Sequence, residues 1–240
     1  ERIEDYQKAA EYANKELKMV NIQHEYGIFG GADGEMVIEF LDKLRVPAVT
    51  TLHTVLYQPS PCQVEILQKI IQRSEKVVVM NSLAIPILRD KYRVPSEKMV
   101  VINHGAPSAC PYRKEEQKVA LGLGDRIVLS TFGLISRGKG IEYVIQALPE
   151  VVRKFPQIVY LIIGITHPQV KAREGESYRK FLEQLVKELS LEKHVIFVNR
   201  YLSKEELIKY LVATDIYLTP YLNSQQIVSG TLAYAMRFGK

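Results

Sequence analysis

The sequence predicts an α/β protein built from two doubly wound parallel sheets, and three observations lead to this prediction. Short, continuous apolar runs rich in β-branched residues recur along the 240 residues. Amphipathic segments with helical periodicity lie between these runs. One Pro-rich, charged stretch at residues 103–116 interrupts the alternation. Strands buried on both faces give continuous rather than alternating apolar runs, so we expect parallel sheets covered by helices on both sides.

The apolar runs give the expected strands in chain order. They lie at residues 46–52, 77–80, 99–102, 127–132, 158–164, 195–198 and 216–219. One further strand is expected just before His24. Apolar stripes with a period of 3.6 residues predict helices over 141–152, 178–189 and 207–212, and a last helix is expected at 232–236.

The Pro-rich stretch is the expected domain boundary. We place it between residues 110 and 111, which gives domains 1–110 and 111–240. About three clear strands precede it and four follow, which favours two lobes facing a cleft over one large sheet. Ligands of doubly wound sheets bind beyond the carboxyl ends of the strands. The chain starts inside a helical pattern and stops at Lys240, just after a glycine, so both domains are expected to be incomplete at the outer ends.

Composition excludes several classes of protein. With 47% hydrophobic and 25% charged residues, the chain is neither disordered nor fibrous. No apolar run approaches the ~18 residues of a membrane helix. Two cysteines cannot form a disulfide framework, which favours a reducing, cytoplasmic environment. The net charge of +5 comes from dispersed side chains, so nucleic acid is not an expected partner.

The strongest local signal for chemistry is the segment from Thr131 to Gly140. A strand end leads through a glycine-containing turn into an amphipathic helix, with Arg137 in the turn and Lys139 expected in the first helical turn. Backbone N–H groups, the helix dipole and two cations would converge there on a phosphate. Neither a P-loop nor a dinucleotide fingerprint is present, and an ordinary βα turn with exposed Lys and Arg stays open as the alternative.

A second candidate is Ser229-Gly230-Thr231, which precedes the last apolar helix. Ser229 can cap that helix and leave the N–H groups of Gly230 and Thr231 directed at an anion, although plain capping explains the pattern equally well. If both helix starts face one cleft, they would hold a diphosphate from two sides.

Histidines form a third group. His24, His53 and His167 each follow an expected strand, where α/β proteins place ligand contacts, and His104 has the same position next to the boundary. A structural, hydrogen-bonded role is the alternative for each. The sequence has no H-E-x-x-H, C-x-x-C or D-x-D pattern and no G-x-S-x-G elbow, so we expect no metal, no cofactor and no hydrolase triad.

Residues 131–148 together with 215–236 resemble the retaining glycosyltransferases of group 1 (family 4), which have the glycosyltransferase-B fold. The resemblance covers nearly the whole chain. It implies two Rossmann-like domains that transfer a sugar from a nucleotide-sugar donor to a hydroxyl acceptor. The C-terminal domain of the family binds mainly the donor and the N-terminal domain mainly the acceptor.

The motif match is partial. Lys139 matches the family's phosphate-binding lysine, whereas Leu134 replaces an arginine whose charge we expect Arg137 to supply. Gln226 and Tyr234 occupy the positions of the family's acidic pair. The missing carboxylates favour the alternative of a non-catalytic nucleotide- or sugar-binding module, while the retained Lys139 and Ser-Gly-Thr favour an enzyme. An epimerase of the same fold would need acid–base residues that the sequence does not offer.

The resemblance assigns residues to three roles. The expected catalytic residues are Lys139, Arg137 and His53. The expected donor-binding residues are Gly133, Ser136, Thr166, His167, Arg200, Gln226, Ser229, Gly230, Thr231 and Tyr234. His24 and Glu25 are expected on the acceptor side. The expected partners are a nucleotide-sugar donor and a hydroxyl acceptor, peripheral membrane association stays open, and no oligomeric state is predicted.

Overall fold

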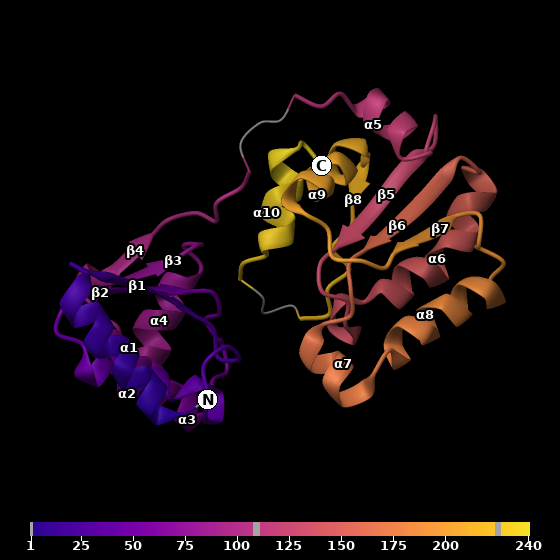
Figure 1. Ribbon diagram of the computed structural model, residues 1–240. Helices are drawn as coiled ribbons and strands as arrows, with labels where there is room; N and C mark the ends of the chain where they lie inside the picture. The colour runs from indigo at the N-terminus through magenta and orange to yellow at the C-terminus, as the bar shows by residue number, and fades with distance from the viewer. Residues whose placement is uncertain (1, 108–110, 224–226) are drawn as a thin grey trace. The chain divides into compact units, whose positions relative to one another are not determined.

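The chain divides into two compact units, each with its own sheet. The computed structural model describes residues 2–107, 111–223 and 227–240. The first unit holds Glu1–His104 with Gln225–Val228, and the second holds Gly105–Ser224 with Ser229–Lys240 (Figure 1). Both sheets are four-stranded and every pair of neighbouring strands is parallel, so the predicted α/β class is confirmed. The units change at His104, a few residues before the expected boundary.

The first unit places its strands in chain order, β1-β2-β3-β4. Its elements are α1 (Ile3–Glu16), β1 (Val20–His24), η1 (Ala32–Gly34), α2 (Val37–Lys43), β2 (Ala48–Leu52), α3 (Pro61–Gln72), β3 (Lys76–Val79), α4 (Ala84–Tyr92), η2 (Ser96–Lys98) and β4 (Met99–Val101). The apolar pattern alone did not predict the whole of β1, because Asn21 and Gln23 interrupt it.

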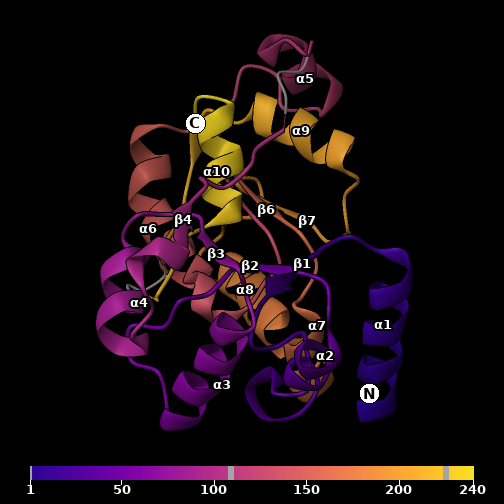
Figure 2. The same ribbon diagram turned by 90° about the vertical axis from the view of Figure 1, so that its left-hand side faces the viewer.

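Only one face of this first sheet is buried by the described residues. Burial alternates along β1 and β2, with Ile22 and Leu52 buried and Gln23 exposed. Helices α2, α3 and α4 lie on the same side of the strands (Figures 1 and 2). The expectation of cover on both faces is therefore wrong for the described part of this unit. Right-handed connections between strands in sequential order place each connecting helix on the same face.

The second unit has the strand order β7-β6-β5-β8. Its elements are α5 (Lys114–Ala120), β5 (Ile127–Phe132), η3 (Arg137–Lys139), α6 (Ile141–Lys154), β6 (Ile158–Ile163), α7 (Pro168–Glu174), α8 (Ser177–Glu188), β7 (Val195–Val198), α9 (Lys204–Ala213), β8 (Ile216–Tyr217) and α10 (Gly230–Arg237). The chain adds strands outward from β5 through β7 and then crosses back to the other side of β5. Helix α5 begins inside the stretch that was expected to be an irregular boundary.

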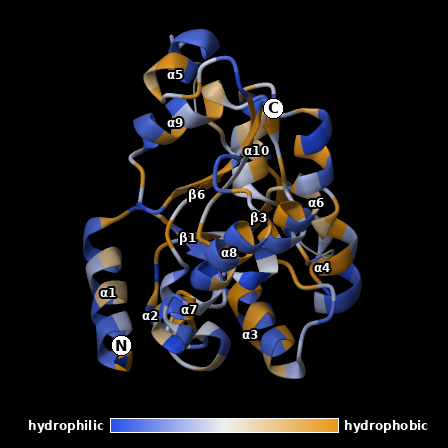
Figure 3. Cartoon of the chain, turned by 90° about the vertical axis from the view of Figure 1, so that its right-hand side faces the viewer, coloured by the Kyte–Doolittle hydropathy of each residue, from blue (hydrophilic) through white to orange (hydrophobic). Residues whose placement is uncertain are grey.

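Helices cover both faces of this second sheet, as predicted. All six residues of the central strand β6 are buried. On one face Tyr160 and Ile162 pack in a cluster with α6 and α8, and on the other Val159 and Leu161 pack with residues of α9 and α10. Figure 3 shows β6 in hydrophobic colours and the outer surface of α8 in hydrophilic ones. Each buried aliphatic side chain contributes about 1.5–3 kcal/mol of transfer free energy, so this double burial anchors the unit.

The carboxyl ends of β5 and β6 approach so closely that only glycine fits between them. Gly164 has a φ of +131°, and a Cβ atom at this position would lie 2.0 Å from the carbonyl oxygen of Gly133. The backbone N–H of Gly133 donates to Ile163 O at 3.0 Å, which fixes the two chains at this spacing. The absence of a side chain at Gly164 is therefore a steric requirement of the sheet end.

We predict that Gly164→Ala lowers the free energy of unfolding of the second unit by at least about 2 kcal/mol, because backbone strain and a clash with backbone add together. Urea unfolding measures the loss. Gly122→Ala is the matched control, since Gly122 also has a positive φ (+70°) but no atom within 4 Å of the added Cβ. That variant should lose only about 1 kcal/mol. Equal losses in the two variants would contradict the steric argument.

Candidate functional site

The reversal of strand order in the second unit brings three segments together beyond the carboxyl ends of β5 and β8. Such a switch point is where open α/β sheets bind ligands. The turn after β5 packs against the segment after β8, because Leu222 N donates to Gly138 O at 3.0 Å. A Cβ atom at Gly140 would lie 2.1 Å from Pro220 O. The start of α10 is the third segment.

Lys139 lies at the centre of this arrangement. Its Nζ atom is 3.8 Å from the centroid of the Tyr221 ring, and the side chain is half-buried. A Cβ atom at Gly133 would lie 3.6 Å from Lys139 Nζ and 3.4 Å from Thr231 Cγ2. The structure thus brings together the lysine, the glycine turn and the start of α10. Lys139 ends the short helix η3 and precedes α6, which begins at Ile141, so the expectation that it lies in the first turn of that helix is wrong. Gly140, with a φ of +63°, separates the two helices.

The start of α10 presents hydroxyl and N–H groups. Ser229 caps the helix, since its Oγ accepts from Leu232 N at 3.2 Å. The same Oγ lies 3.0 Å from Thr231 Oγ1. Among the described residues no acceptor is found for the backbone N–H groups of Gly230 and Thr231. The capping role that the sequence left open is present, and it leaves two N–H groups at the positive end of the helix dipole.

Two tyrosines link these groups. The Tyr221 hydroxyl lies 2.6 Å from Thr231 Oγ1 and 3.4 Å from the Tyr217 hydroxyl, which donates to Phe132 O. Burial raises the pKa of Tyr217, so this phenol stays neutral. Burial also opposes ionisation of Tyr221, but the neighbouring Lys139 ammonium and the hydroxyl contacts with Thr231 and Tyr217 outweigh it and lower the pKa of its phenol. Sequence reasoning missed both side chains, although both lie near the end of an expected strand.

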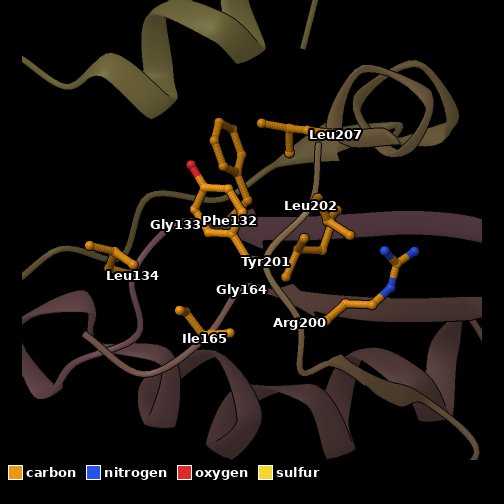
Figure 4. Close-up of a pocket in the computed structure, with 10 residues that line it drawn as sticks. Phe132, Gly133, Leu134, Gly164, Ile165, Arg200, Tyr201, Leu202 and Leu207 are labelled. Atoms are coloured by element: carbon orange, nitrogen blue, oxygen red, sulfur yellow. The ribbon is translucent and has the colours of Figure 1, made fainter. Parts of the chain in front are cut away.

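An apolar pocket of about 190 Å³ opens beside this cluster, at the carboxyl ends of β5, β6 and β7. Its wall combines the backbone of Gly133 and Gly164 with side chains from the ends of β5 and β6, from the loops after β5, β6 and β7, and from α9 (Figure 4). Those side chains are Phe132, Leu134, Ile163, Ile165, Arg200, Tyr201, Leu202 and Leu207. Of these, the sequence pointed only to Arg200 for donor binding. An apolar slot next to a cation can hold an uncharged planar ring whose substituent carries negative charge.

Arg200 lines this pocket, but its charge is already paired. Its Nη1 donates to Glu206 Oε1 at 2.6 Å, and Figure 4 shows the guanidinium pointing away from the apolar side chains. Glu206 also caps α9 by accepting from the backbone N–H of Ser203 at 2.9 Å. That backbone hydrogen bond, followed by the contact with Arg200, lowers the pKa of Glu206 to about 2. Arg200 therefore acts at the rim of the pocket as one partner of an ion pair.

Arg137 is directed at α8. Its guanidinium carbon lies 5.2 Å from the ring centroid of Tyr178 and 5.9 Å from that of Phe181. Its Nε is 4.0 Å from Glu174 Oε2. The guanidinium that was expected to supply the charge of the family arginine, replaced here by Leu134, is therefore occupied by other partners. No described contact directs Arg137 toward the groups around Lys139, so its expected part in phosphate binding stays a prediction.

Other expected donor residues have structural partners. Thr166 is buried and donates to Glu176, and Nδ1 of His167 caps α7 by accepting from Gln169 N at 3.2 Å. Ser136 accepts the backbone hydrogen bond of Lys139 N at 3.0 Å, which closes the η3 turn. His167 thus has the structural role that the sequence left open as its alternative. No described contact joins His167 to Lys139.

A buried arginine that the sequence did not reveal fixes the floor of the pocket. Arg179, on α8, is 7% exposed. Its Nη2 donates to Gly164 O at 2.9 Å, and its other nitrogens contact Asn199 and Glu176. The side chain therefore holds the ends of β6 and β7, which flank the pocket, in a fixed relation.

The two positions of the acidic pair differ in what the structure shows. Tyr234 is partly buried and packs against the core at Phe132, with a ring-centroid distance of 6.3 Å. Gln226 lies outside the described residues. Within those residues no three His, Cys, Asp or Glu side chains gather as metal ligands. No helix in the described part of the chain combines the length and apolarity needed to cross a bilayer.

In the first unit, the expected acceptor residues lie at the carboxyl ends of β1 and β2. His53 is exposed and its Nε2 lies 2.8 Å from Gln23 Oε1, while Glu25 accepts from Thr54 Oγ1 at 2.6 Å. His24 is completely buried beside the rings of Tyr26 and Phe29. Neither nitrogen of its ring has a hydrogen-bond partner among the described residues. His53 is thus accessible to a ligand, and His24 is not.

The comparison with protein families concerns mainly the second unit. Residues 113–226 match the family model of the glycosyl transferases group 1. A GDP-mannose-dependent alpha-(1-6)-phosphatidylinositol monomannoside mannosyltransferase from Mycolicibacterium smegmatis is 28% identical over 110 residues, which are 46% of this chain and 26% of that protein.

Solved structures resemble the fold of nearly the whole chain. Anabaena Alr3699/HepE in complex with UDP and glucose has a TM-score of 0.74 and 19% identity, with 98% of this chain and 60% of that one covered. A sucrose-phosphate synthase from Thermosynechococcus elongatus has a TM-score of 0.74 and 20% identity, with 99% and 59% covered. These likenesses show the fold, and the chain spans well under two thirds of each of these proteins.

We predict that His24 makes the stability of the first unit pH-dependent. Burial, with a smaller contribution from His53, lowers its pKa from 6.5 to about 4. Between pH 4 and pH 6.5 the imidazole of His24 is therefore protonated in the unfolded chain but neutral in the folded one. The free energy of unfolding should therefore be highest above pH 6.5 and fall by up to about 3 kcal/mol as the pH drops toward 4.

Urea unfolding across this pH range measures the effect, and NMR titration of the imidazole ring measures the pKa itself. His24→Phe should flatten the pH dependence, whereas His53→Gln, at an exposed position, should leave most of it. An imidazole of His24 that titrates near 6.5 would contradict the prediction.

Proposed function

We propose that the protein containing this chain transfers a sugar from a nucleotide-sugar donor to a hydroxyl acceptor, because residues 113–226 match the family model of the glycosyl transferases group 1. The second unit holds the nucleoside diphosphate part of the donor. The proposal is supported by the family match and by UDP in the similar Anabaena structure.

One observation carries the proposal. Lys139 Nζ and the start of α10, which are groups suited to binding phosphate, lie next to an apolar pocket at the switch point of the sheet. A nucleoside diphosphate has the complementary chemistry, with two charged phosphates and a planar base. We assign the phosphates to Lys139, Ser229 and Thr231, and the base to the pocket beside Tyr201 and Leu207.

In transfer, the bond between the anomeric carbon and the phosphate oxygen breaks, and a bond to the acceptor oxygen forms. Negative charge grows on the departing phosphate. Lys139 and the N–H groups of Gly230 and Thr231 stabilise that charge more strongly in the transition state than in the bound donor. Since these groups already oppose the phosphate charge, we propose that transfer requires no metal ion. EDTA should then leave nucleotide affinity unchanged.

We further propose that transfer retains the anomeric configuration through front-face displacement. A covalent route would require a carboxylate nucleophile at the donor sugar. Tyr234 occupies one position where the resembling family has a carboxylate, and its partly buried ring packs against the core. In the front-face route the departing phosphate oxygen accepts the proton of the acceptor hydroxyl. The acceptor side is assigned to the first unit, with His53 and Glu25 as its exposed and half-buried polar groups.

A non-catalytic nucleotide-binding module is the second candidate, and it is favoured because Tyr234 stands where the resembling family has a carboxylate. The two candidates differ in turnover. An enzyme should hydrolyse the donor slowly without acceptor, whereas a binding module should bind the nucleotide and release no sugar.

We predict that Lys139→Ala in the full-length protein lowers kcat/KM by about a hundredfold or more, equivalent to about 2.7 kcal/mol, because one preorganised cation is removed from the leaving phosphate. Steady-state kinetics of nucleoside diphosphate release measures the effect, with folding checked by circular dichroism. Arg137→Ala should cost much less, since Arg137 contacts Tyr178 and Phe181. Near wild-type turnover of Lys139→Ala would remove this residue from the mechanism.

We also predict that Tyr201→Ala separates base binding from phosphate binding. Tyr201 lines the pocket and is 78% exposed, so its loss should weaken nucleoside diphosphate binding by several-fold without unfolding the unit. Affinity for inorganic pyrophosphate should stay unchanged. Calorimetry with both ligands measures the difference, and a parallel loss for pyrophosphate would argue against the assignment of the base to the pocket.

A further inference from the structure

We propose that Tyr221 is a positioning residue of the donor site, whose ring supports the Lys139 ammonium and whose hydroxyl ties that lysine to the start of α10. This inference rests on the proposed function. It adds a specific task for a side chain that neither the motif nor the spacing of the sequence indicated.

The ring of Tyr221 supplies the first contact. Lys139 Nζ lies 3.8 Å from its centroid, well within the ~6 Å range of a cation–π interaction. None of the ion pairs found among the described residues involves Lys139. The aromatic face therefore holds the ammonium in place without neutralising it, and the full positive charge stays available to a phosphate.

The hydroxyl of Tyr221 supplies the second contact. It lies 2.6 Å from Thr231 Oγ1, which in turn lies 3.0 Å from the Oγ of the N-cap residue Ser229. One side chain thus touches both groups assigned to the diphosphate. The lowered pKa of Tyr221 agrees with a phenol oxygen that accepts hydrogen bonds despite burial, which acts against ionisation.

The backbone on both sides of Tyr221 is fixed against the turn that carries Lys139. Pro220 O packs against Gly140, where a Cβ atom would lie only 2.1 Å away, and Leu222 N donates to Gly138 O at 3.0 Å. The Tyr217 hydroxyl, 3.4 Å away, holds the phenol from the strand β8 side. The ring therefore has little freedom to leave Lys139.

The test uses the full-length protein and three variants, Tyr221→Phe, Tyr221→Leu and Thr231→Val. UDP, GDP and ADP serve as probes, and calorimetry on whichever binds the wild type gives the dissociation constant. Tyr143→Leu is the matched control, because Tyr143 is a 56% exposed tyrosine of the same unit outside the site. Circular dichroism and Tm confirm that each variant is folded.

The expected losses follow from the contacts that each variant removes. Tyr221→Leu should weaken nucleotide binding about tenfold, Tyr221→Phe by a few-fold, and Tyr143→Leu not at all. Since Tyr221→Leu acts through Lys139, adding it to Lys139→Ala should cause much less than a further tenfold loss. Thr231→Val and Tyr221→Phe break the same hydrogen bond. The double variant should therefore bind nucleotide no more weakly than whichever single variant binds it more weakly.

Two results would overturn the inference: wild-type affinity in Tyr221→Leu, or a loss that adds fully to that of Lys139→Ala. If Tyr221→Leu fails to fold, Tyr221→Phe and Thr231→Val decide instead. Unchanged nucleotide affinity in these two variants, or losses of affinity that add fully in the double variant, would count against the inference. If the wild type binds none of the three nucleotides, the proposed function fails and the inference with it. A wild type that binds nucleotide while Tyr221→Leu binds equally well removes only the inference.

Discussion

The return of the chain across β5 to form β8 is the constraint on which the candidate site depends. If β8 were added beside β7, the segment after it would lie at the far edge of the sheet. Because β8 pairs with β5 instead, the turn that carries Lys139 and the segment that carries Tyr221 emerge side by side. Parallel pairing then places both at the carboxyl edge, so topology alone converts two distant stretches of sequence into neighbours.

This arrangement requires a rigid sheet beneath it. β6 is buried along its whole length, and Arg179 holds the ends of β6 and β7 together from the side of α8. The absence of a side chain at Gly164 allows the ends of β5 and β6 to approach each other closely beside the pocket. The strands that are packed in the core also carry the site at their carboxyl ends, so the geometry of the site depends on the packing of the core.

The sequence predicted the parts of the fold whose signal is local. The bounds of β5 and β7 are as expected, because strands packed between helices leave continuous apolar runs. β1 was harder to delimit, since only one of its faces is buried and Asn21 and Gln23 dilute the pattern. At the site, Lys139 and Ser229 follow from a glycine turn and a helix cap that can be recognised along the chain. Tyr221 and Arg179 could not be found in this way, because their roles depend on which strands are neighbours and which side chains meet across the sheet.

The contact between Lys139 and the Tyr221 ring also affects the conformational entropy of ligand binding. A solvated lysine side chain loses up to about 2 kcal/mol of rotamer freedom when it is immobilised on a ligand. In this unit the side chain is half-buried and already rests on an aromatic surface 3.8 Å from its ammonium. Much of that freedom is lost when the chain folds, before any phosphate arrives. The ordering cost falls on the stability of the second unit rather than on the affinity for its ligand.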